Sequence, residues 1–430
     1  MHNEGQWQPV QLGEVLEFLR NGTSSNQCTA QTAYPVTRIE TISEGKIDFS
    51  RTGYLHLPEE SYRMAPGDIL YSHINSVAHI GKVAIFLGGK TLYHGMNLML
   101  LRPTKEKIYP KYLFSILSSE IGRRYARREC KPAVNQASLT QSDICKFSFL
   151  IPELPEQSRI AYVLDTIDEA IVRTEAVISK LKQVRAGMLH DLLRYGLDEH
   201  GQFRDPIAHP EQFKESPLGL IPKEWAVKPL NDILDLRRGF AFSSSHYVNS
   251  GILNYRVTNI GYNLQSLGDT TFLPKRFFAD FPNQQLFGGE IVIVMVGATT
   301  GKLGRVPKDC CPALMNQNMW NIVPKQKVDR EYLWHLLPNA VHRHMSMSQG
   351  SARDFLKQTE FVKTIVAGPF ENGFDEQERI VSKLDSLERN ILIDEAELSK
   401  LKSLKSGLQN DLLTGRVRAP ETIMKGAENA

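Results

Sequence analysis

The chain has 430 residues, of which 41% are hydrophobic and 23% are charged, and this length suits two or three domains. Its formal net charge of +3 excludes a basic field over the whole surface, so a nucleic-acid site would have to be a local patch. No apolar run approaches the ~18 residues of a membrane span, we expect no signal peptide, and five cysteines without a C-x-x-C pair favour a reducing, cytoplasmic setting over a disulfide framework.

The first 151 residues predict one mixed α/β (α+β) domain. Short β-type runs at 83–86 and 98–101 are bounded by glycine and proline, and a helix is expected near Tyr112. The densest basic segment follows at 122–131, on an expected helix end. It holds five positive charges within nine residues and is the strongest local patch of positive charge.

A long amphipathic helix is predicted next, within residues 152–196. Steps of four and three residues visit ten positions, eight of them apolar, a 3.5-residue period typical of a coiled-coil seam. The apolar positions are Ile160, Leu164, Ile167, Ile171, Ile178, Leu181, Met188 and Leu192. Gly196 ends the helix, and residues 197–221, rich in proline, glycine and charge, are interpreted as an extended connector.

The second half repeats the first. Residues 376–413 match residues 156–193 at a constant offset of 220 with 17 of 38 positions identical, which predicts two helices of one design. The second seam consists of Ile380, Leu384, Leu387, Ile391, Leu398, Leu401, Leu408 and Leu412. Weaker repeats precede each helix, such as Trp7 and Trp225. They predict a second domain over 222–369, with a strand at 291–296 and a helix near Tyr332, then a helix region at 370–418 and a tail at 419–430.

The polar residues within the two seams favour an antiparallel pair with pseudo-two-fold symmetry. A parallel pair in register would place Arg185 against Lys405, two like charges that are partly desolvated. An antiparallel pair instead places Arg185 near Leu387, where its stem can pack while its charged head extends to water. The alternative is that each helix only covers its own neighbouring domain. A helix of 38 residues is ~57 Å long.

The ordered, duplicated set of motifs resembles the specificity subunit of type I restriction–modification systems over essentially the whole chain. The motifs are Ser216-Pro217-Leu218-Gly219 with Trp225, Glu-Gln-x-Arg-Ile at both helix starts, Gly67-Asp68-Ile69-Leu70, Asp191-Leu192-Leu193, and Asp411-Leu412-Leu413-Thr414-Gly415-Arg416-Val417. The second domain departs mildly, with Gly289-Glu290-Ile291-Val292 at the position of Gly-Asp-Ile-Leu.

The resemblance implies two tandem target-recognition domains, each binding one half of a split, asymmetric site on double-stranded DNA. It implies that the helix pair separates them and docks two methyltransferase (modification) subunits, and that restriction/translocase subunits can join. It implies no catalytic residue, metal or cofactor in this chain, because S-adenosylmethionine belongs to the partner methyltransferase. At 3.4 Å per base pair, the ~57 Å helix corresponds to at most ~17 base pairs between the two domains.

The residues themselves agree with a binding role. Gly297 to Lys302 lacks the spacing and the Ser/Thr of a P-loop, and His335, His342 and His344 lack zinc-like partners, so a helix surface is the expected setting of these histidines. Two rival hypotheses remain: the recognition arm of a restriction–methylation enzyme with its own activity, and a coiled-coil scaffold without DNA specificity. Binding of S-adenosylmethionine by the chain alone would support the first rival.

Candidate DNA contacts lie in the basic segment and in three loop regions that recur in both halves. The first loop region is 72–76 and 297–300, the second is 94–97 and 316–318, and the third is 135–138 and 349–353. Lys and Arg contact phosphates, whereas Arg, Lys, Asn, Gln, Ser and Thr on loops contact base edges. The candidates are Arg38, His73, Asn75, Lys82, Asn97, Arg123, Arg124, Arg127, Lys131, Gln136, Asn259, Thr300, Lys302, Gln317, Gln349, Ser351 and Arg353. For any one of the loop residues the alternative is an ordinary role in a turn, and for the basic segment it is a solvated helix face.

Overall fold

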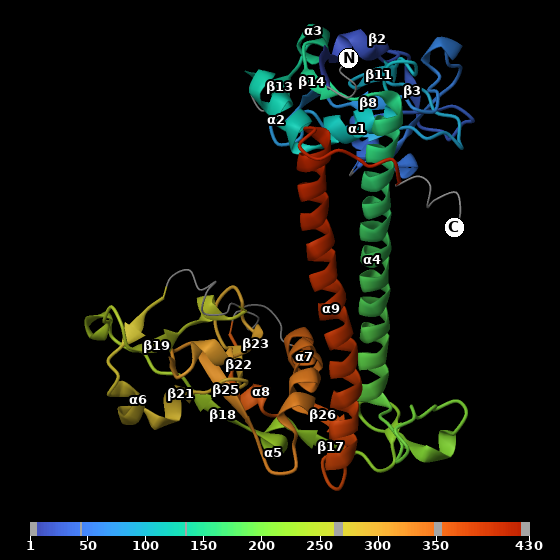
Figure 1. Cartoon of the computed structure of the whole chain (residues 1–430). Coiled ribbons are helices and arrows are strands. Elements are labelled where there is room, and N and C mark those ends of the chain that lie inside the picture. The colour runs from blue at the N-terminus through green and yellow to red at the C-terminus, as the bar shows by residue number, and fades with distance from the viewer. Residues whose placement is uncertain (1–6, 44, 134–135, 262–269, 348–354, 423–430) are drawn as a thin grey trace. The chain divides into compact units, whose positions relative to one another are not determined.

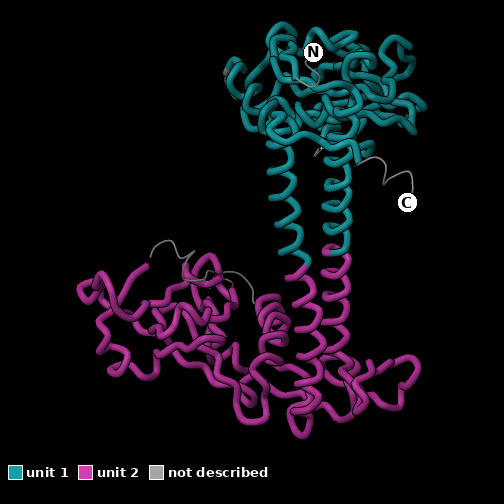
Figure 2. The backbone as a smooth tube through the Cα atoms, viewed as in Figure 1, with its two compact units in different colours: residues 1–177, 394–430 teal, residues 178–393 magenta. Residues whose placement is uncertain are grey.

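A computed structural model describes residues 7–43, 45–133, 136–261, 270–347 and 355–422 (Figure 1). The chain forms two compact units: unit 1 comprises residues 1–177 and 394–430, and unit 2 comprises residues 178–393 (Figure 2). Two long helices, α4 (Leu154–Arg194) and α9 (Phe374–Leu413), each contribute to both units. They confirm the two predicted long helices, and each begins two residues before the repeated segment.

Unit 1 is built on short strands and three short helices. The strands are β1 (Gln8–Gln11), β2 (Leu16–Asn21), β3 (Gln27–Cys28), β4 (Pro35–Val36), β5 (Ile42–Ser43), β6 (Lys46–Ile47), β7 (Gly53–Leu55), β8 (Ile69–Tyr71), β9 (Ile74–Asn75), β10 (Val83–Ile85), β11 (Met99–Pro103), β12 (Lys131–Ala133), β13 (Gln136–Ser138) and β14 (Ser148–Ile151). The helices are α1 (Pro110–Ser118), α2 (Glu120–Glu129) and α3 (Gln141–Cys145). The main sheet has the antiparallel order β10-β8-β11-β2.

Unit 2 repeats this plan. Its strands are β15 (Phe213–Lys214), β16 (Ile221–Pro222), β17 (Ala226–Pro229), β18 (Leu234–Arg238), β19 (Ile252–Tyr255), β20 (Phe272–Leu273), β21 (Gln285–Leu286), β22 (Ile291–Val294), β23 (Leu303–Arg305), β24 (Ala313–Met315), β25 (Met319–Pro324) and β26 (Ile365–Gly368). Its helices are α5 (Leu230–Ile233), α6 (Phe277–Asp280), α7 (Arg330–Met347) and α8 (Gln358–Phe361). The main sheet β23-β22-β25-β18 corresponds strand for strand to β10-β8-β11-β2. Unit 2 also contains a second sheet with the order β20-β19-β24-β21.

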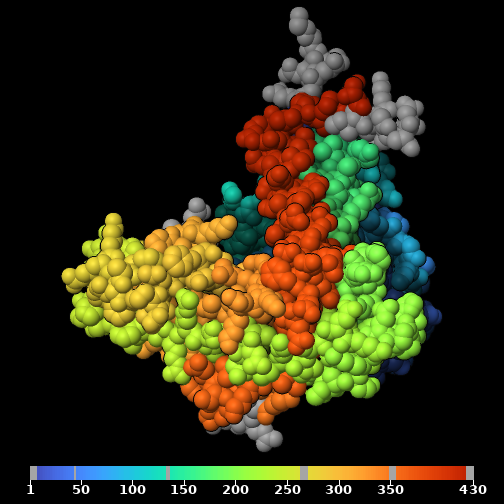
Figure 3. Space-filling view, turned by 90° about the horizontal axis from the view of Figure 1, so that it is seen from below, coloured from blue at the N-terminus to red at the C-terminus, as the bar shows by residue number. Residues whose placement is uncertain are grey.

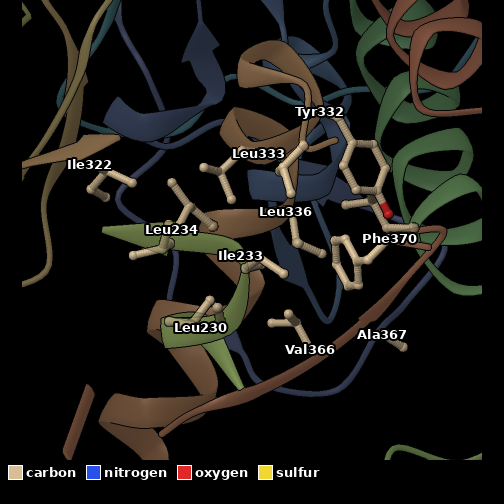
Figure 4. Packing of buried hydrophobic residues seen from close by; sticks show 14 of the residues in the cluster. Leu230, Ile233, Leu234, Ile322, Tyr332, Leu333, Leu336, Val366, Ala367 and Phe370 are labelled. Atoms are coloured by element: carbon tan, nitrogen blue, oxygen red, sulfur yellow. The ribbon is translucent and has the colours of Figure 1, made fainter. Parts of the chain in front are cut away.

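The sheet of unit 2 is buried on both faces, which explains its continuous apolar strand. Side chains alternate between the two faces of a strand. Ile291 and Ile293 therefore join the core that contains α7, whereas Val292 and Val294 join a second core against β19 and β24. Figure 4 shows Tyr332 and Leu336 of α7 packed towards Ile233 and Phe370, and the rings of Tyr332 and Phe370 lie edge to face at 6.4 Å.

The ends of both long helices complete the core of each unit. In unit 1, Leu412 of α9 packs into the same cluster as Ile160 and Leu164 of α4. In unit 2, Leu192 of α4 joins Ile380 of α9 in the corresponding cluster. The alternative that each helix only covers its own neighbouring domain does not fit this shared packing. The other predicted seam residues are also buried or half-buried: Ile167, Ile171, Ile178, Leu181, Leu384, Leu387, Ile391, Leu398 and Leu401.

Two of the polar seam residues, Arg185 and Lys405, form ion pairs between the helices. Arg185 of α4 donates to Glu388 of α9 at 2.7 Å within unit 2. Lys405 of α9 pairs with Asp168 of α4 within unit 1. Both charged heads remain partly exposed, and each also pairs with a carboxylate on the facing helix, which was not anticipated from the sequence. The two ion pairs are equivalent under the offset of 220, since 168 + 220 = 388 and 185 + 220 = 405.

A buried glutamate starts each long helix and acts as a hub of hydrogen bonds. In unit 2, Glu376 accepts from the Trp225 indole at 3.2 Å, from Arg204 at 2.6 Å and from the Leu197 backbone at 2.9 Å. Arg204 belongs to the connector, which carries the hairpin β15–β16 and lies at the surface beside the start of α9 (Figure 3). Although the segment was expected to be extended, it is therefore folded and anchored.

The same hub recurs in unit 1 with different partners along the chain. Glu156 accepts from the Trp7 indole at 3.3 Å and from Arg418, which follows α9, at 2.6 Å. Burial alone would raise the pKa of Glu156, but the Arg418 guanidinium and the neighbouring donors hold that pKa below its usual range. The next residue, Gln157, donates to Pro152 and accepts from Tyr109, as Gln377 does with Pro369 and Asp329. The repeated Glu-Gln pair is thus structural.

Other expectations can be compared with the described residues. No helix in the described ranges has both the length and the apolar character of a membrane span. All five cysteines are free thiols. The described part of the chain brings together no group of three or more potential metal ligands. His335, which was expected on a helix surface, is instead buried on α7. Its neighbour Leu336 lies in the core, and burial lowers the pKa of His335.

Candidate nucleic-acid interface

The three predicted loop regions come together in unit 1. The first and third are joined because β9 pairs with β13, with Asn75 opposite Ala137, and because Leu139 N–H donates to the His73 carbonyl at 2.8 Å. The second lies close to the first, since Tyr71, which ends β8 just before the first loop, pairs with Met99, which starts β11 just after the second. Segments separated by about sixty residues of sequence thus form one surface region next to the main sheet.

Backbone hydrogen bonds also join described segments beside the main sheet of unit 2. Met295 N–H donates to the Asn318 carbonyl at 2.9 Å, and Leu356 N–H donates to the Met295 carbonyl at 2.7 Å. The Thr300 hydroxyl donates to the Gly297 carbonyl, and the Lys302 ammonium donates to the Ile260 carbonyl. Both side chains therefore hold the first loop region in place through bonds to backbone oxygens. Three predicted contacts in the third loop, Gln349, Ser351 and Arg353, lie outside the described residues.

The structure divides the predicted site residues by exposure. Arg38, Asn75, Lys82 and Thr300 are half-buried. Asn97, Arg123, Arg124, Arg127, Lys131, Gln136, Lys302 and Gln317 are exposed. Arg38 donates to the Gln27 amide oxygen at 2.6 Å, which orients its guanidinium within its own domain. The exposed set contains most of the predicted positive charge of unit 1.

His73 and Asn259 are buried, which was not anticipated. Asn259 is 2% exposed, and its amide oxygen accepts from the Arg256 backbone at 2.8 Å, so it closes a turn. His73 is 5% exposed, and its Nδ1 has no hydrogen-bond partner among the described residues. Because a base edge must reach the contacting atom directly, this burial favours a supporting role for both residues over the predicted contact with DNA.

The basic segment forms helix α2, which begins at the Ser119 cap and carries four arginines and two glutamates, a net charge of +2 (4 − 2). Arg127 pairs with Glu120, and Arg128 pairs with Glu129 at 2.7 Å. Arg124 and Arg128 line a hollow of about 690 Å³ together with Asn410 and Thr414 from the end of α9. One face of α2 therefore points towards α9, whereas Arg123 is exposed on the helix surface.

The buried His94 predicts acid sensitivity of unit 1. Burial lowers the pKa of His94 to about 4, below its ordinary 6.5, and its Nδ1 has no acceptor among the described residues. The unfolded chain takes up a proton at higher pH than the folded chain, so stability is full above pH 6.5 and falls as the pH approaches 4. The loss is on the order of 3 kcal/mol.

His94→Met should remove this part of the acid sensitivity, because methionine occupies the equivalent buried position, Met315. Denaturant unfolding at pH 7.5 and at pH 5 checks it. The wild type should lose more stability between the two pH values than the variant does. Equal losses would show that His94 does not titrate in this way.

Comparisons with known proteins follow this geometry. The family model "Type I restriction modification DNA specificity domain" matches residues 4–183 and 222–403. A putative type I restriction enzyme MjaX specificity subunit of Methanocaldococcus jannaschii is 32% identical over 427 residues, covering 96% of this chain and 94% of that protein. The Escherichia coli EcoKI specificity subunit is 26% identical over 183 residues, 39% of each chain.

Solved structures show the same fold. The S subunit of a type I restriction–modification system from M. genitalium superimposes with a TM-score of 0.57 at 15% identity, covering 96% of this chain and 97% of that one. A chain from a structural study of assembly and conformational transition of the type I system gives a TM-score of 0.54 at 16% identity, covering 96% and 99%. The chain belongs to the family of type I restriction–modification specificity subunits, the non-catalytic DNA-recognition components of these systems.

Proposed function

We propose that this chain recognises a bipartite, asymmetric DNA target, with one half-site bound by each of the domains 1–151 and 222–369. The observation that carries the proposal is the duplication of one scaffold with different loops. The main sheets correspond strand for strand, and in each unit backbone hydrogen bonds tie described loops beside that sheet. Two copies with different side chains on their loops would recognise two different half-sites.

We further propose that regions 152–196 and 370–418 pair as an antiparallel coiled coil with pseudo-two-fold symmetry. The ion pairs Arg185–Glu388 and Asp168–Lys405 support this, because the offset of 220 converts one into the other. Residues 197–221 and the residues after α9 then play equivalent parts. Each supplies an arginine, Arg204 or Arg418, to the glutamate that starts the other helix.

Reversal of one charge across the helix pair tests this arrangement. Arg185→Glu places two carboxylates together at the Glu388 position, and it should lower the free energy of unfolding by about 1 kcal/mol, since the pair is partly exposed. Adding Glu388→Arg should restore most of the loss. Thermal unfolding of the two single variants and the double variant measures the coupling. Additive losses without recovery would refute the pairing.

The outer faces of the long helices suit the docking of protein partners, which we propose to be two methyltransferase subunits. Six large apolar side chains outside the seam are between 41% and 63% exposed: Val172, Val177, Val184, Leu392, Ile393 and Leu404. We take them as parts of apolar surface that a bound protein would cover, since large exposed apolar patches mark interaction sites. S-adenosylmethionine would belong to those partners, restriction subunits can join them, and the assembly would work on cytoplasmic DNA.

Long-read methylation sequencing of the source organism, with and without this gene, tests the proposed function. The proposal predicts a methylated motif made of two different half-sites with a spacer of constant length, and this motif disappears when the gene is deleted. A contiguous palindrome would contradict the proposal. Methylation that does not depend on the gene would instead favour a scaffold without DNA specificity.

A further inference from the structure

In unit 1, two loops at one end of the main sheet are clipped together by backbone hydrogen bonds. Residues 22–25 follow β2, and residues 94–97 precede β11, the strand paired with β2 (Figure 1). Thr23 N–H donates to the His94 carbonyl at 2.9 Å, and Met96 N–H donates to the Thr23 carbonyl at 3.1 Å. We call these segments the first loop pair.

Unit 2 contains the same clip between residues 239–242, after β18, and residues 315–318, before β25. Phe240 N–H donates to the Met315 carbonyl at 3.1 Å, and Gln317 N–H donates to the Phe240 carbonyl at 3.0 Å. This second loop pair matches the first bond for bond, so Phe240 corresponds to Thr23 and Gln317 corresponds to Met96. The backbone of the clip is therefore duplicated along with the sheet.

Each clip depends on two backbone features that restrict the sequence. A Cβ atom on Gly22 would lie 2.1 Å from the Gly95 carbonyl oxygen, and one on Gly239 would lie 1.9 Å from the Asn316 carbonyl oxygen, so glycine is required at both close approaches. Asn97 and Asn318 both adopt a φ of 74°, a conformation that few residues other than glycine and asparagine accept. Both halves therefore adopt the same loop geometry and place the same two restrictions on the sequence.

The side chains that the two clips present differ in chemistry. Met96 is 51% exposed in the first loop pair, whereas its counterpart Gln317 is an exposed amide. Phe240 is 44% exposed in the second pair, whereas its counterpart Thr23 is buried and donates to the Ser25 hydroxyl. Removing large exposed apolar side chains from water is favourable, so a partner that covers them would gain binding free energy. The two loop pairs thus share one backbone geometry but present different side chains.

We infer that the two loop pairs are the elements that distinguish bases, and that positions 96 and 317 set the choice at equivalent places in the two half-sites. The inference rests on the proposed function. A glutamine amide can bond both N7 and the N6 amino group of adenine, whereas apolar groups contact the methyl group of thymine. Gln317 therefore specifies an adenine in the second half-site. Met96 favours a thymine at the equivalent place in the first.

Exchange of the two residues tests this. Strains of the source organism in which the chain carries Gln317→Met, Met96→Gln or Gln317→Glu replace the wild type, and long-read sequencing determines the methylated motif. Gln317→Met should lower discrimination at one position of the second half-site by roughly tenfold and leave the first half-site unchanged. Met96→Gln should do the reverse. Gln317→Glu should shift the preference towards cytosine, whose amino group needs an acceptor.

Gln212→Met, an equally polar-to-apolar change on the exposed connector, is the matched control and should leave the motif unchanged. An unaltered motif in all three variants overturns the inference. Equal weakening at every position overturns it as well, because that result indicates contact with the DNA backbone. Failure of the proposed function is a separate result, since the wild-type strain would then show no methylated motif that depends on the gene.

Discussion

Glu376→Ala is expected to lower the free energy of unfolding of unit 2 by about 3 kcal/mol, the low end of the cost of breaking a buried ion pair. The loss arises because the variant removes the acceptor of the Trp225 indole, the Arg204 guanidinium and the Leu197 backbone. Arg204 is only 7% exposed, so its charge stays largely buried. It keeps Glu224 as a weaker, exposed partner, which limits the loss.

Denaturant unfolding followed by tryptophan fluorescence measures this effect. Glu378→Ala is the matched control, because Glu378 lies one half-turn away on the exposed face of α9. Its effect should stay within about 0.5 kcal/mol. Similar stabilities for the two variants would show that the Glu376 hub does not stabilise the unit.

Gly239→Ala is expected to abolish recognition of the second half-site while it leaves the first half-site intact. The added Cβ would lie 1.9 Å from the Asn316 carbonyl oxygen, a backbone atom, so the two loops must separate. The two backbone hydrogen bonds between Phe240 and the facing loop would then break. Overpacking of this kind costs about 1–3 kcal/mol.

The control for this variant is Gly187→Ala on α4, where an added Cβ meets no atom within 4 Å. It should raise stability by about 0.5–1 kcal/mol, because alanine is the better helix former, and it should leave DNA recognition unchanged. Filter binding with targets altered in one half-site separates the two halves. If Gly239→Ala still discriminates between sequences in the second half-site, the loops do not need their close approach.

The sequence predicted much of the fold because its strongest signals are periodic. The repeated segments 156–193 and 376–413 lie within two residues of the ends of α4 and α9, and the strands at 83–86, 98–101 and 291–296 correspond to β10, β11 and β22. The residues against which the two helices pack were harder to predict from the sequence. Both Arg185 and Glu388 are visible in the printed sequence. Their pairing could be assigned only after the two helices were aligned in space.

The sequence indicated which loops of unit 1 meet better than it indicated which of their side chains are exposed. In unit 1 the three loop regions come together, but burial of His73 and Asn259 depends on the tertiary packing of loops that local sequence does not specify. The hubs at Glu156 and Glu376 were missed as well. The sequence does contain a signal for them. Trp7 and Trp225, and likewise Glu156 and Glu376, repeat at nearly the same offset, which would be expected if each tryptophan contacts the glutamate of its own half.

The most direct test of the account is the affinity of the assembled complex for targets whose spacer is lengthened or shortened by one base pair. If one chain holds two recognition domains at a set separation, each step moves one half-site by roughly 3.4 Å and rotates it out of register. Affinity should then fall at least as far as for a mismatch, roughly tenfold or more. Equal affinity across the series of spacers would contradict the account.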